Sequence, residues 1–160
     1  MKRILCACLL CFACLNFAAC SYQTYTDTLS CEEIANKLAS EISPSEDYKS
    51  YSNEEVGLLL DKNVEYDDCC FLYSGSSDDI SEIAVFHSAE ADLLFDKLSE
   101  YTDTLRSDKR SFVENYLPSE LKKLDDGQAR RFGNYVILAI LDKSERDAVF
   151  EAAKNFLSKK

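Results

Sequence analysis

The chain has 160 residues, which is enough for one domain of ordinary size with a hydrophobic core. Hydrophobic residues make up 46% of it, and 29 acidic against 18 basic side chains give a formal net charge of −11 at pH 7. So acidic a chain repels phosphate groups, which argues against a nucleic-acid-binding protein and against broad adhesion to anionic membranes.

The first twenty residues predict export from the cytoplasm. Lys2-Arg3 precede an uncharged run from Ile4 to Phe17, which is shorter than the roughly 20 residues of a membrane-spanning helix. Ala18-Ala19 then stand directly before Cys20, which resembles the lipobox of bacterial lipoproteins, although an aliphatic residue is usual in place of Phe17. We expect a diacylglyceryl lipid on Cys20 and removal of residues 1–19. Ordinary secretory cleavage or an uncut anchor is the alternative.

Processing at Cys20 predicts a protein anchored to the extracytoplasmic face of the cell membrane. Residues 20–29 are predicted to form a polar tether, and residues 30–160 a single domain. The processed chain carries 16 basic and 29 acidic side chains, a net charge of −13, so its attachment depends on the lipid. Residues 20–100 contribute −15 and residues 101–160 contribute +2. We interpret both halves as solvated surface; the alternative is a molecule whose less acidic half faces membrane or wall polymer.

Three of the eight cysteines remain for the domain itself. Four lie in the expected leader and Cys20 takes the lipid, which leaves Cys31, Cys69 and Cys70. This odd number allows at most one intrachain disulfide. Neighbouring strand residues point to opposite faces, so the thiols of Cys69 and Cys70 diverge. Cys31 pairs with one of them if the first helix covers that strand; otherwise all three act as small apolar residues.

Two short helices are predicted at the start of the domain, over residues 31–42 and 52–60, with a loop over 43–50 between them. Each helix begins with a capping box, in which a serine and a glutamate satisfy backbone donors reciprocally: Ser30 with Glu33, and Ser52 with Glu55.

Hairpins and helices alternate in the rest of the chain. Strands are predicted over residues 66–73 and 80–86, and Ser88 is expected to cap a long helix that ends at Pro118. A short helical turn is expected over 119–124.

A second hairpin follows, over residues 128–132 and 135–141, with a tight turn at Gly133-Asn134. Its second strand is apolar on both faces, which indicates an interior position. Ser144 with Asp147 is expected to cap the last helix. The sequence thus predicts an α+β fold: an antiparallel sheet of about four strands from two hairpins, packed with a long helix and a C-terminal helix, plus two short N-terminal helices.

Several segments in this order resemble a known family, over about residues 31–157. They are Glu82-Ile83-Ala84-Val85-Phe86, the long helix, Phe112-Val113-Glu114-Asn115-Tyr116-Leu117-Pro118 and Gly133-Asn134-Tyr135-Val136. The chain is similar to domain-of-unknown-function family 4358, a family of lipoproteins of Gram-positive bacteria. It departs from the pattern at Cys69-Cys70, where larger aliphatic residues are expected, and at residues 128–131, whose polarity suggests an edge strand. The resemblance implies the anchor and the fold, but no activity and no site residues.

Few residues indicate chemistry. His87, the only histidine, stands at a strand end before a helix, but a general base also needs an orienting acid and a nucleophile. Asp67-Asp68 and Asp78-Asp79 flank the first hairpin and would suit calcium if they converged. No phosphate-binding glycine motif is present, and the cysteine spacing matches no zinc pattern.

The sequence therefore favours a non-enzymatic binding or accessory module of the cell envelope, held by lipid on Cys20, with an envelope protein or a wall ligand as partner. No cofactor is expected. The alternative is a thiol- or metal-dependent redox or binding protein that uses Cys69, Cys70, Cys31 and His87.

Overall fold

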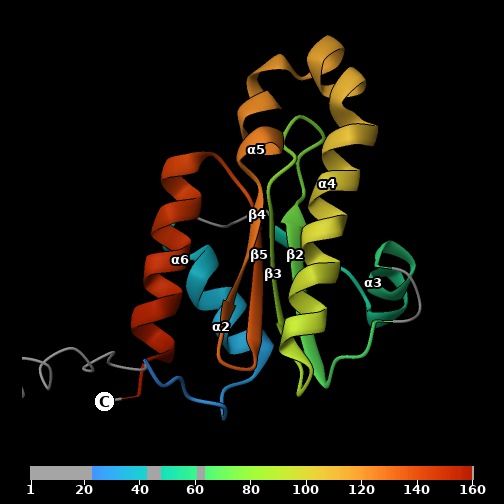
Figure 1. Ribbon diagram of the computed structural model, residues 1–160. Helices are drawn as coiled ribbons and strands as arrows, with labels where there is room; N and C mark the ends of the chain where they lie inside the picture. The colour runs from blue at the N-terminus through green and yellow to red at the C-terminus, as the bar shows by residue number, and fades with distance from the viewer. Residues whose placement is uncertain (1–22, 43–47, 61–63, 160) are drawn as a thin grey trace, which may run out of the picture.

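The computed structural model describes residues 23–42, 48–60 and 64–159 (Figure 1). In chain order its elements are α2 (Cys31–Ala39), β1 (Tyr48–Ser50), α3 (Asn53–Leu59), β2 (Asp68–Ser74), β3 (Glu82–His87), α4 (Ala91–Tyr116), the 3-10 helix η2 (Pro118–Glu120), α5 (Leu121–Asp126), β4 (Gln128–Phe132), β5 (Tyr135–Ile140) and α6 (Lys143–Leu157). The predicted leader and Cys20 lie outside the described residues.

The strands form one antiparallel sheet in the order β1-β2-β3-β5-β4. The α+β class, both hairpins, the long helix and the C-terminal helix are confirmed, but the expectation of about four strands is one short. The additional strand is β1, which lies in the predicted loop and pairs with the end of β2. Three residues are too few to show an alternating pattern, and β1 forms because β2 offers it an open edge.

Helices cover both faces of the sheet (Figure 1). α4 lies on one face, and α2 and α6 lie on the other. Because successive strand residues point to opposite sides, each inner strand supplies both layers. In β3, Ala84 and Phe86 belong to the α4 side, whereas Ile83 and Val85 belong to the α2 side. The domain thus has three layers and two hydrophobic cores.

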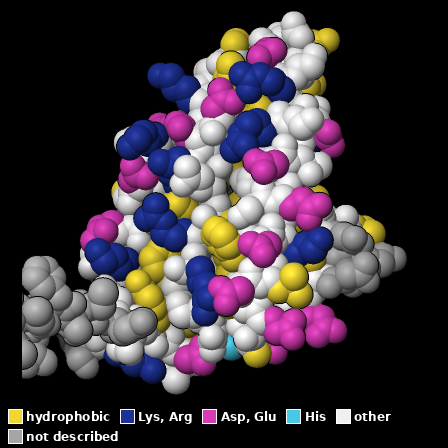
Figure 2. Space-filling model, viewed as in Figure 1, with side chains coloured by type: hydrophobic (Ala, Val, Ile, Leu, Met, Phe, Trp, Pro, Cys, Tyr) yellow, Lys and Arg dark blue, Asp and Glu magenta, His cyan; other side chains and the backbone are white. Residues whose placement is uncertain are grey.

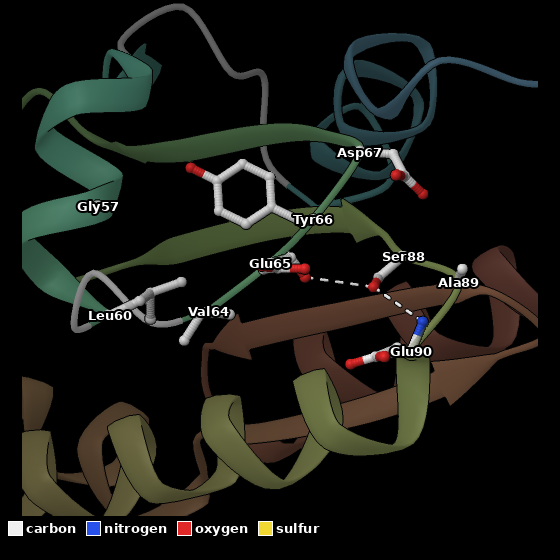
Figure 3. Close-up of a pocket in the computed structure, with 9 residues that line it drawn as sticks. All are labelled: Gly57, Leu60, Val64, Glu65, Tyr66, Asp67, Ser88, Ala89 and Glu90. Carbon is white, nitrogen blue, oxygen red and sulfur yellow. Dashed lines mark hydrogen bonds between the residues drawn. The ribbon is translucent and has the colours of Figure 1, made fainter.

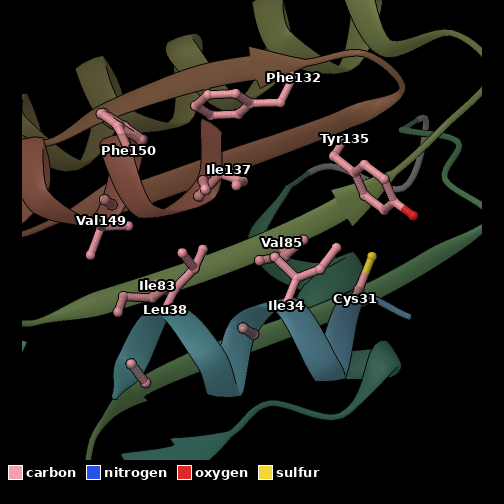
Figure 4. Packing of buried hydrophobic residues seen from close by; sticks show 14 of the residues in the cluster. Cys31, Ile34, Leu38, Ile83, Val85, Phe132, Tyr135, Ile137, Val149 and Phe150 are labelled. Atoms are coloured by element: carbon pink, nitrogen blue, oxygen red, sulfur yellow. The ribbon is translucent and has the colours of Figure 1, made fainter. Parts of the chain in front are cut away.

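The first core fills the space between the sheet, α2 and α6 (Figure 4). Ile34 and Leu38 project from α2 toward Val85 and Ile83 of β3, and Phe150 enters from α6. All five side chains are fully or almost fully buried. Each stabilises the fold by about 1.5–3 kcal/mol relative to an exposed position.

The second core lies beneath α4 and stops before that helix ends. Leu94 and Leu98 pack against the α4 face of the sheet, where the rings of Phe71 and Phe86 meet edge to face with centroids 6.3 Å apart. Within α4, no side chain between Thr102 and Val113 is buried. The C-terminal half of the helix therefore leaves space against the sheet.

The second hairpin matches its prediction. All six residues of β5 are buried because helices cover both of its faces, and β4 is the edge strand that its polarity indicated. Gly133 has a φ of +67°, in the left-handed region that glycine tolerates best. A Cβ atom there would also lie 3.1 Å from the Cβ of Tyr25.

Two predicted helix caps are wrong. The N-cap of α6 is Asp142, whose Oδ1 accepts the backbone N–H groups of Ser144 and Glu145 at 2.9 and 3.1 Å. Ser88 precedes α4 by too many residues to cap it; its hydroxyl accepts the N–H of Glu90 instead. The Ser52 capping box of α3 is confirmed, and Ser30 accepts the N–H of Glu33 at the start of α2. The two errors arise because several polar residues near each helix start satisfy the same pattern.

Ordered structure begins before Ser30, where the tether was expected. Tyr25 forms a bridge with Ser158, the N–H of Thr26 donates to the carbonyl of Leu157 at 2.7 Å, and the Tyr25 ring packs edge-on against Phe132. The described part of that segment therefore lies against the domain and the end of α6. Within the described ranges, no helix has both the length and the apolarity needed to cross a membrane.

Candidate functional site

A groove of about 260 Å³ opens where the turn of the β2–β3 hairpin meets the C-terminal half of α4. We call it the Glu82 groove. Its lining comes from the segment after β1, the hairpin, α4 and α5: Tyr51, Tyr73, Ser74, Ser77, Asp79, Ile80, Ser81, Glu82, Leu105, Lys109, Phe112, Val113, Leu117 and Leu124.

Glu82 is the first residue of β3 and lies on the face of the sheet that α4 covers. It pairs with Tyr73 of β2 and with Ile140 of β5, and Ala84 and Phe86 follow it on the same face. The Tyr101 hydroxyl donates a hydrogen bond to Glu82 Oε2 at 3.1 Å. Among the described residues, no lysine or arginine forms an ion pair with this carboxylate. The groove therefore contains an acidic group with a single neutral partner.

Burial changes the titration of this pair of residues. It raises the pKa of the Glu82 carboxyl to about 7, although the Tyr101 hydrogen bond and the charge of Lys109 act in the opposite direction. Burial and the neighbouring carboxylate likewise raise the pKa of Tyr101, which stays neutral and donates. Glu82 thus exchanges its proton near neutral pH.

Two stacked tyrosines form one wall of the groove. The rings of Tyr51 and Tyr73 are 4.1 Å apart at an interplanar angle of 20°, and Tyr51 also meets Phe71 edge-on at 5.3 Å. The backbone N–H of Tyr51 donates to the carbonyl of Phe71 at 3.0 Å, which fixes the segment after β1 to the sheet. The wall is a rigid aromatic surface beside the Glu82 carboxylate.

The hairpin turn is fastened to α5 by ion pairs. Lys123 Nζ lies 2.7 Å from Asp79 Oδ1 and 2.8 Å from Glu120 Oε2. Burial alone would raise the pKa of Asp79, but hydrogen bonds from Lys123 and Ser81 outweigh it and hold that pKa well below its ordinary value. Asp79 is thus paired with a cation within the protein, whereas the partner of Glu82 is the neutral Tyr101 hydroxyl.

His87 lies at the opposite end of β3 and binds the N-terminal segment. Its Nε2 is 2.7 Å from Asp27 Oδ1 and its Nδ1 is 3.2 Å from Asp67 Oδ2. The hydrogen bond from His87 holds the pKa of Asp27 below its ordinary value, and Asn134 donates to the same carboxylate. Because carboxylates engage both ring nitrogens, neither is free to activate a nucleophile. His87 fastens the segment before α2.

The three cysteines of the domain are free thiols. Cys31 and Cys70 pack in the α2–α6 core and Cys69 in the α4 core, so the expected divergence of Cys69 and Cys70 is confirmed. Burial raises the pKa of Cys31 and of Cys69, and that of Cys70 to about 11. The thiols are therefore protonated at neutral pH and poorly suited to nucleophilic or metal chemistry.

The two acidic pairs that flank the first hairpin do not converge. Asp67-Asp68 stand at the start of β2, whereas Asp78-Asp79 follow its other end, about 20 Å away along a seven-residue strand. Asp68 accepts the N–H of Cys31 at 2.8 Å. In the described part of the chain, no three His, Cys, Asp or Glu side chains are grouped to hold a metal ion.

A second pocket, of about 560 Å³, lies between the end of α3 and the junction of β3 with α4 (Figure 3). Ser88 joins its two sides, because its hydroxyl donates to the carbonyl of Glu65 and accepts the N–H of Glu90. Residues 61–63, which connect Leu60 to Val64 on its wall, are outside the described residues. We therefore treat the Glu82 groove, all of whose lining is described, as the candidate site.

The charges of the surface do not mark a separate site. Figure 2 shows basic and acidic side chains interspersed over the face formed by α6, β4 and α4. Arg131 of β4, for example, pairs with Asp92 of α4. This face presents no field of one sign.

Sequence patterns did not identify Glu82. Glu82 lies within the strand predicted over residues 80–86, and Tyr101 lies within the predicted long helix, so neither stands out from its element. The available signal was an acid at an inward position of a strand that runs beneath a helix. Its aromatic neighbours Tyr51 and Tyr73 come from separate segments, and no spacing in the sequence brings them together.

Comparison with known proteins gives no relative: no family model or curated protein matches the sequence, and no solved structure matches the fold. The resemblance to family 4358 stays a prediction.

Proposed function

We propose that the protein is an extracytoplasmic binding protein of the cell envelope, attached to the membrane by a lipid on Cys20, and that it takes a small ligand into the Glu82 groove. The observation that carries this proposal is the groove itself. Ligand sites are concave and mainly apolar, with a few placed polar groups. Here apolar side chains such as Leu105 and Phe112 surround the polar groups of Glu82 and Lys109.

The walls of the groove are held by contacts within the domain, which supports ligand binding without a large rearrangement of the protein. Tyr51 and Tyr73 are held by stacking and by the sheet, and the Asp79–Lys123–Glu120 ion pairs hold the hairpin turn against α5. A preorganised site loses less conformational entropy when it binds. The thiol-dependent alternative has no comparable support, since the pKa values of the cysteines are raised.

The groove is tested by NMR on the processed chain, produced from residue 20 with Cys20→Ser so that it remains free of lipid. Three aromatic probes that differ in charge are added in turn: phenethylammonium, 2-phenylethanol and 3-phenylpropionate. We expect at least one probe to shift amide signals of the residues that line the groove. Ser77→Trp places an indole at the lining of the groove and should abolish these shifts.

Ser76→Trp is the matched control, because Ser76 belongs to the same exposed turn but does not line the groove. It should leave the shifts unchanged. The proposal fails if no probe shifts the groove signals, or if Ser77→Trp leaves binding intact.

A further inference from the structure

We infer that the ligand of the Glu82 groove is an organic cation: a small amine whose ammonium group meets the Glu82 carboxylate while its apolar body lies against Tyr51 and Tyr73. This inference rests on the proposed function and specifies the chemistry of its ligand.

The charges of the lining favour a cation. Three charged side chains line the groove, the carboxylates of Glu82 and Asp79 and the ammonium of Lys109. Asp79 is already neutralised by Lys123 at 2.7 Å, whereas Glu82 has the neutral Tyr101 hydroxyl as its partner. A carboxylate in partly desolvated surroundings gains more from an opposite charge than one in water. An anionic ligand would find the ammonium of Lys109 but would be repelled by the Glu82 carboxylate, which no cation of the described residues pairs with.

The aromatic wall favours the same ligand. Tyrosine rings attract cations to their faces, and the effect grows when the cation is removed from water. The stacked pair of Tyr51 and Tyr73 stands next to Glu82, because Tyr73 is its direct cross-strand neighbour. A carboxylate beside these aromatic rings can thus hold an ammonium group by charge and the attached carbon skeleton by contact.

The size of the groove favours a free small molecule. Its volume of about 260 Å³ is just below the roughly 300–1,000 Å³ of pockets for drug-sized ligands. Leu105, Phe112 and Leu117 provide the apolar surface opposite the hairpin. A single ring with a short aminoalkyl chain matches both the apolar and the charged part of this lining.

Calorimetric or NMR titration of the same processed chain at pH 8 compares the three probes. At this pH Glu82, with a pKa of about 7, is mostly ionised, and an alkylamine stays protonated. We expect phenethylammonium to bind at least about tenfold more tightly than 2-phenylethanol, with 3-phenylpropionate weakest. Glu82→Gln should weaken the amine at least about tenfold and leave the alcohol nearly unchanged.

Asp78→Asn is the matched control, since it removes an acid from the same hairpin turn outside the groove lining. It should leave all three affinities unchanged. Equal binding of amine and alcohol, preference for the acid, or full amine affinity in Glu82→Gln would overturn the inference while the proposed function stands. If none of the three probes reaches the groove, both fail.

Discussion

Glu82 places a carboxyl group where the strand pattern calls for an apolar side chain, between Tyr73 on one neighbouring strand and Ile140 on the other. Its burial raises its pKa from an unfolded value near 4.3 to about 7. The native state therefore holds a proton that the unfolded state releases between these pH values. This favourable contribution is complete below about pH 4.3 and is lost as the pH rises through 7.

Glu82→Gln removes this pH dependence, because glutamine stays neutral. We compare the unfolding free energy of the variant with that of the wild type at each pH. This difference should be on the order of 2–3 kcal/mol more favourable to the variant at pH 8 than at pH 5. Urea unfolding of both proteins at the two pH values measures the difference. Burial holds the pKa values of the neighbouring Tyr51 and Tyr101 above their ordinary range, so both stay neutral between these pH values.

Both proteins share every other titratable group, so the contributions of those groups cancel in this comparison. Asp78→Asn, at an exposed position, should change stability by less than about 0.5 kcal/mol at either pH. If the unfolding free energies of Glu82→Gln and the wild type differ by the same amount at pH 5 and at pH 8, the Glu82 carboxyl does not titrate near neutrality.

At the scale of elements, the start of α6 shows where sequence patterns stop being specific. Asp142, Ser144 and Asp147 are all good capping residues, and the pattern of Ser144 with Asp147 resembles a capping box. The backbone decides: Asp142 is extended, with φ −63° and ψ 162°, and accepts two N–H groups. Asp147 instead pairs with Lys143 and Arg146.

Asp142→Ala should therefore cost about 1 kcal/mol of stability, since two N–H groups at the helix start lose their acceptor. Ser144→Ala is the matched control and should cost less than about half as much, because its hydroxyl bonds only to Asp142. Thermal or urea unfolding compares them. If Ser144→Ala is the more destabilising change, the assignment of the cap is wrong.

The elements that could be predicted are those whose pattern is local and long. β5 is a continuous apolar run, and Gly133-Asn134 marks the turn that joins it to β4. α4 is a helix of 26 residues with apolar side chains at helical spacing. β1 could not be predicted, because its three residues form a strand only against the edge of β2. The same limit hid the Glu82 groove, whose walls come from four separate segments that meet only after the sheet and α4 have packed.

At the scale of the whole molecule, the two ends of the domain differ. Tyr25 and Ser158 join the N-terminal segment to the end of α6, at the bottom of Figure 1, whereas the hairpin turn and α5 lie at the top. α4 runs from one end toward the other, and 26 helical residues span about 39 Å. A lipid on Cys20, which precedes the described chain by three residues in the sequence, would put the Glu82 groove at the end of the domain far from the anchor.

We propose that this domain works outside the cytoplasmic membrane, anchored through Cys20. This is tested by the intact mass of the protein extracted from membranes of a bacterium that processes lipoproteins. We predict a chain that begins at Cys20 and carries the mass of its lipid. The Cys20→Ser variant should be lost from the membrane fraction or should retain residues 1–19 as an uncut precursor. The Cys14→Ser variant, which alters the expected leader, should give the same processed mass as the wild type. A wild-type chain without lipid, or one that retains residues 1–19, would contradict the claim.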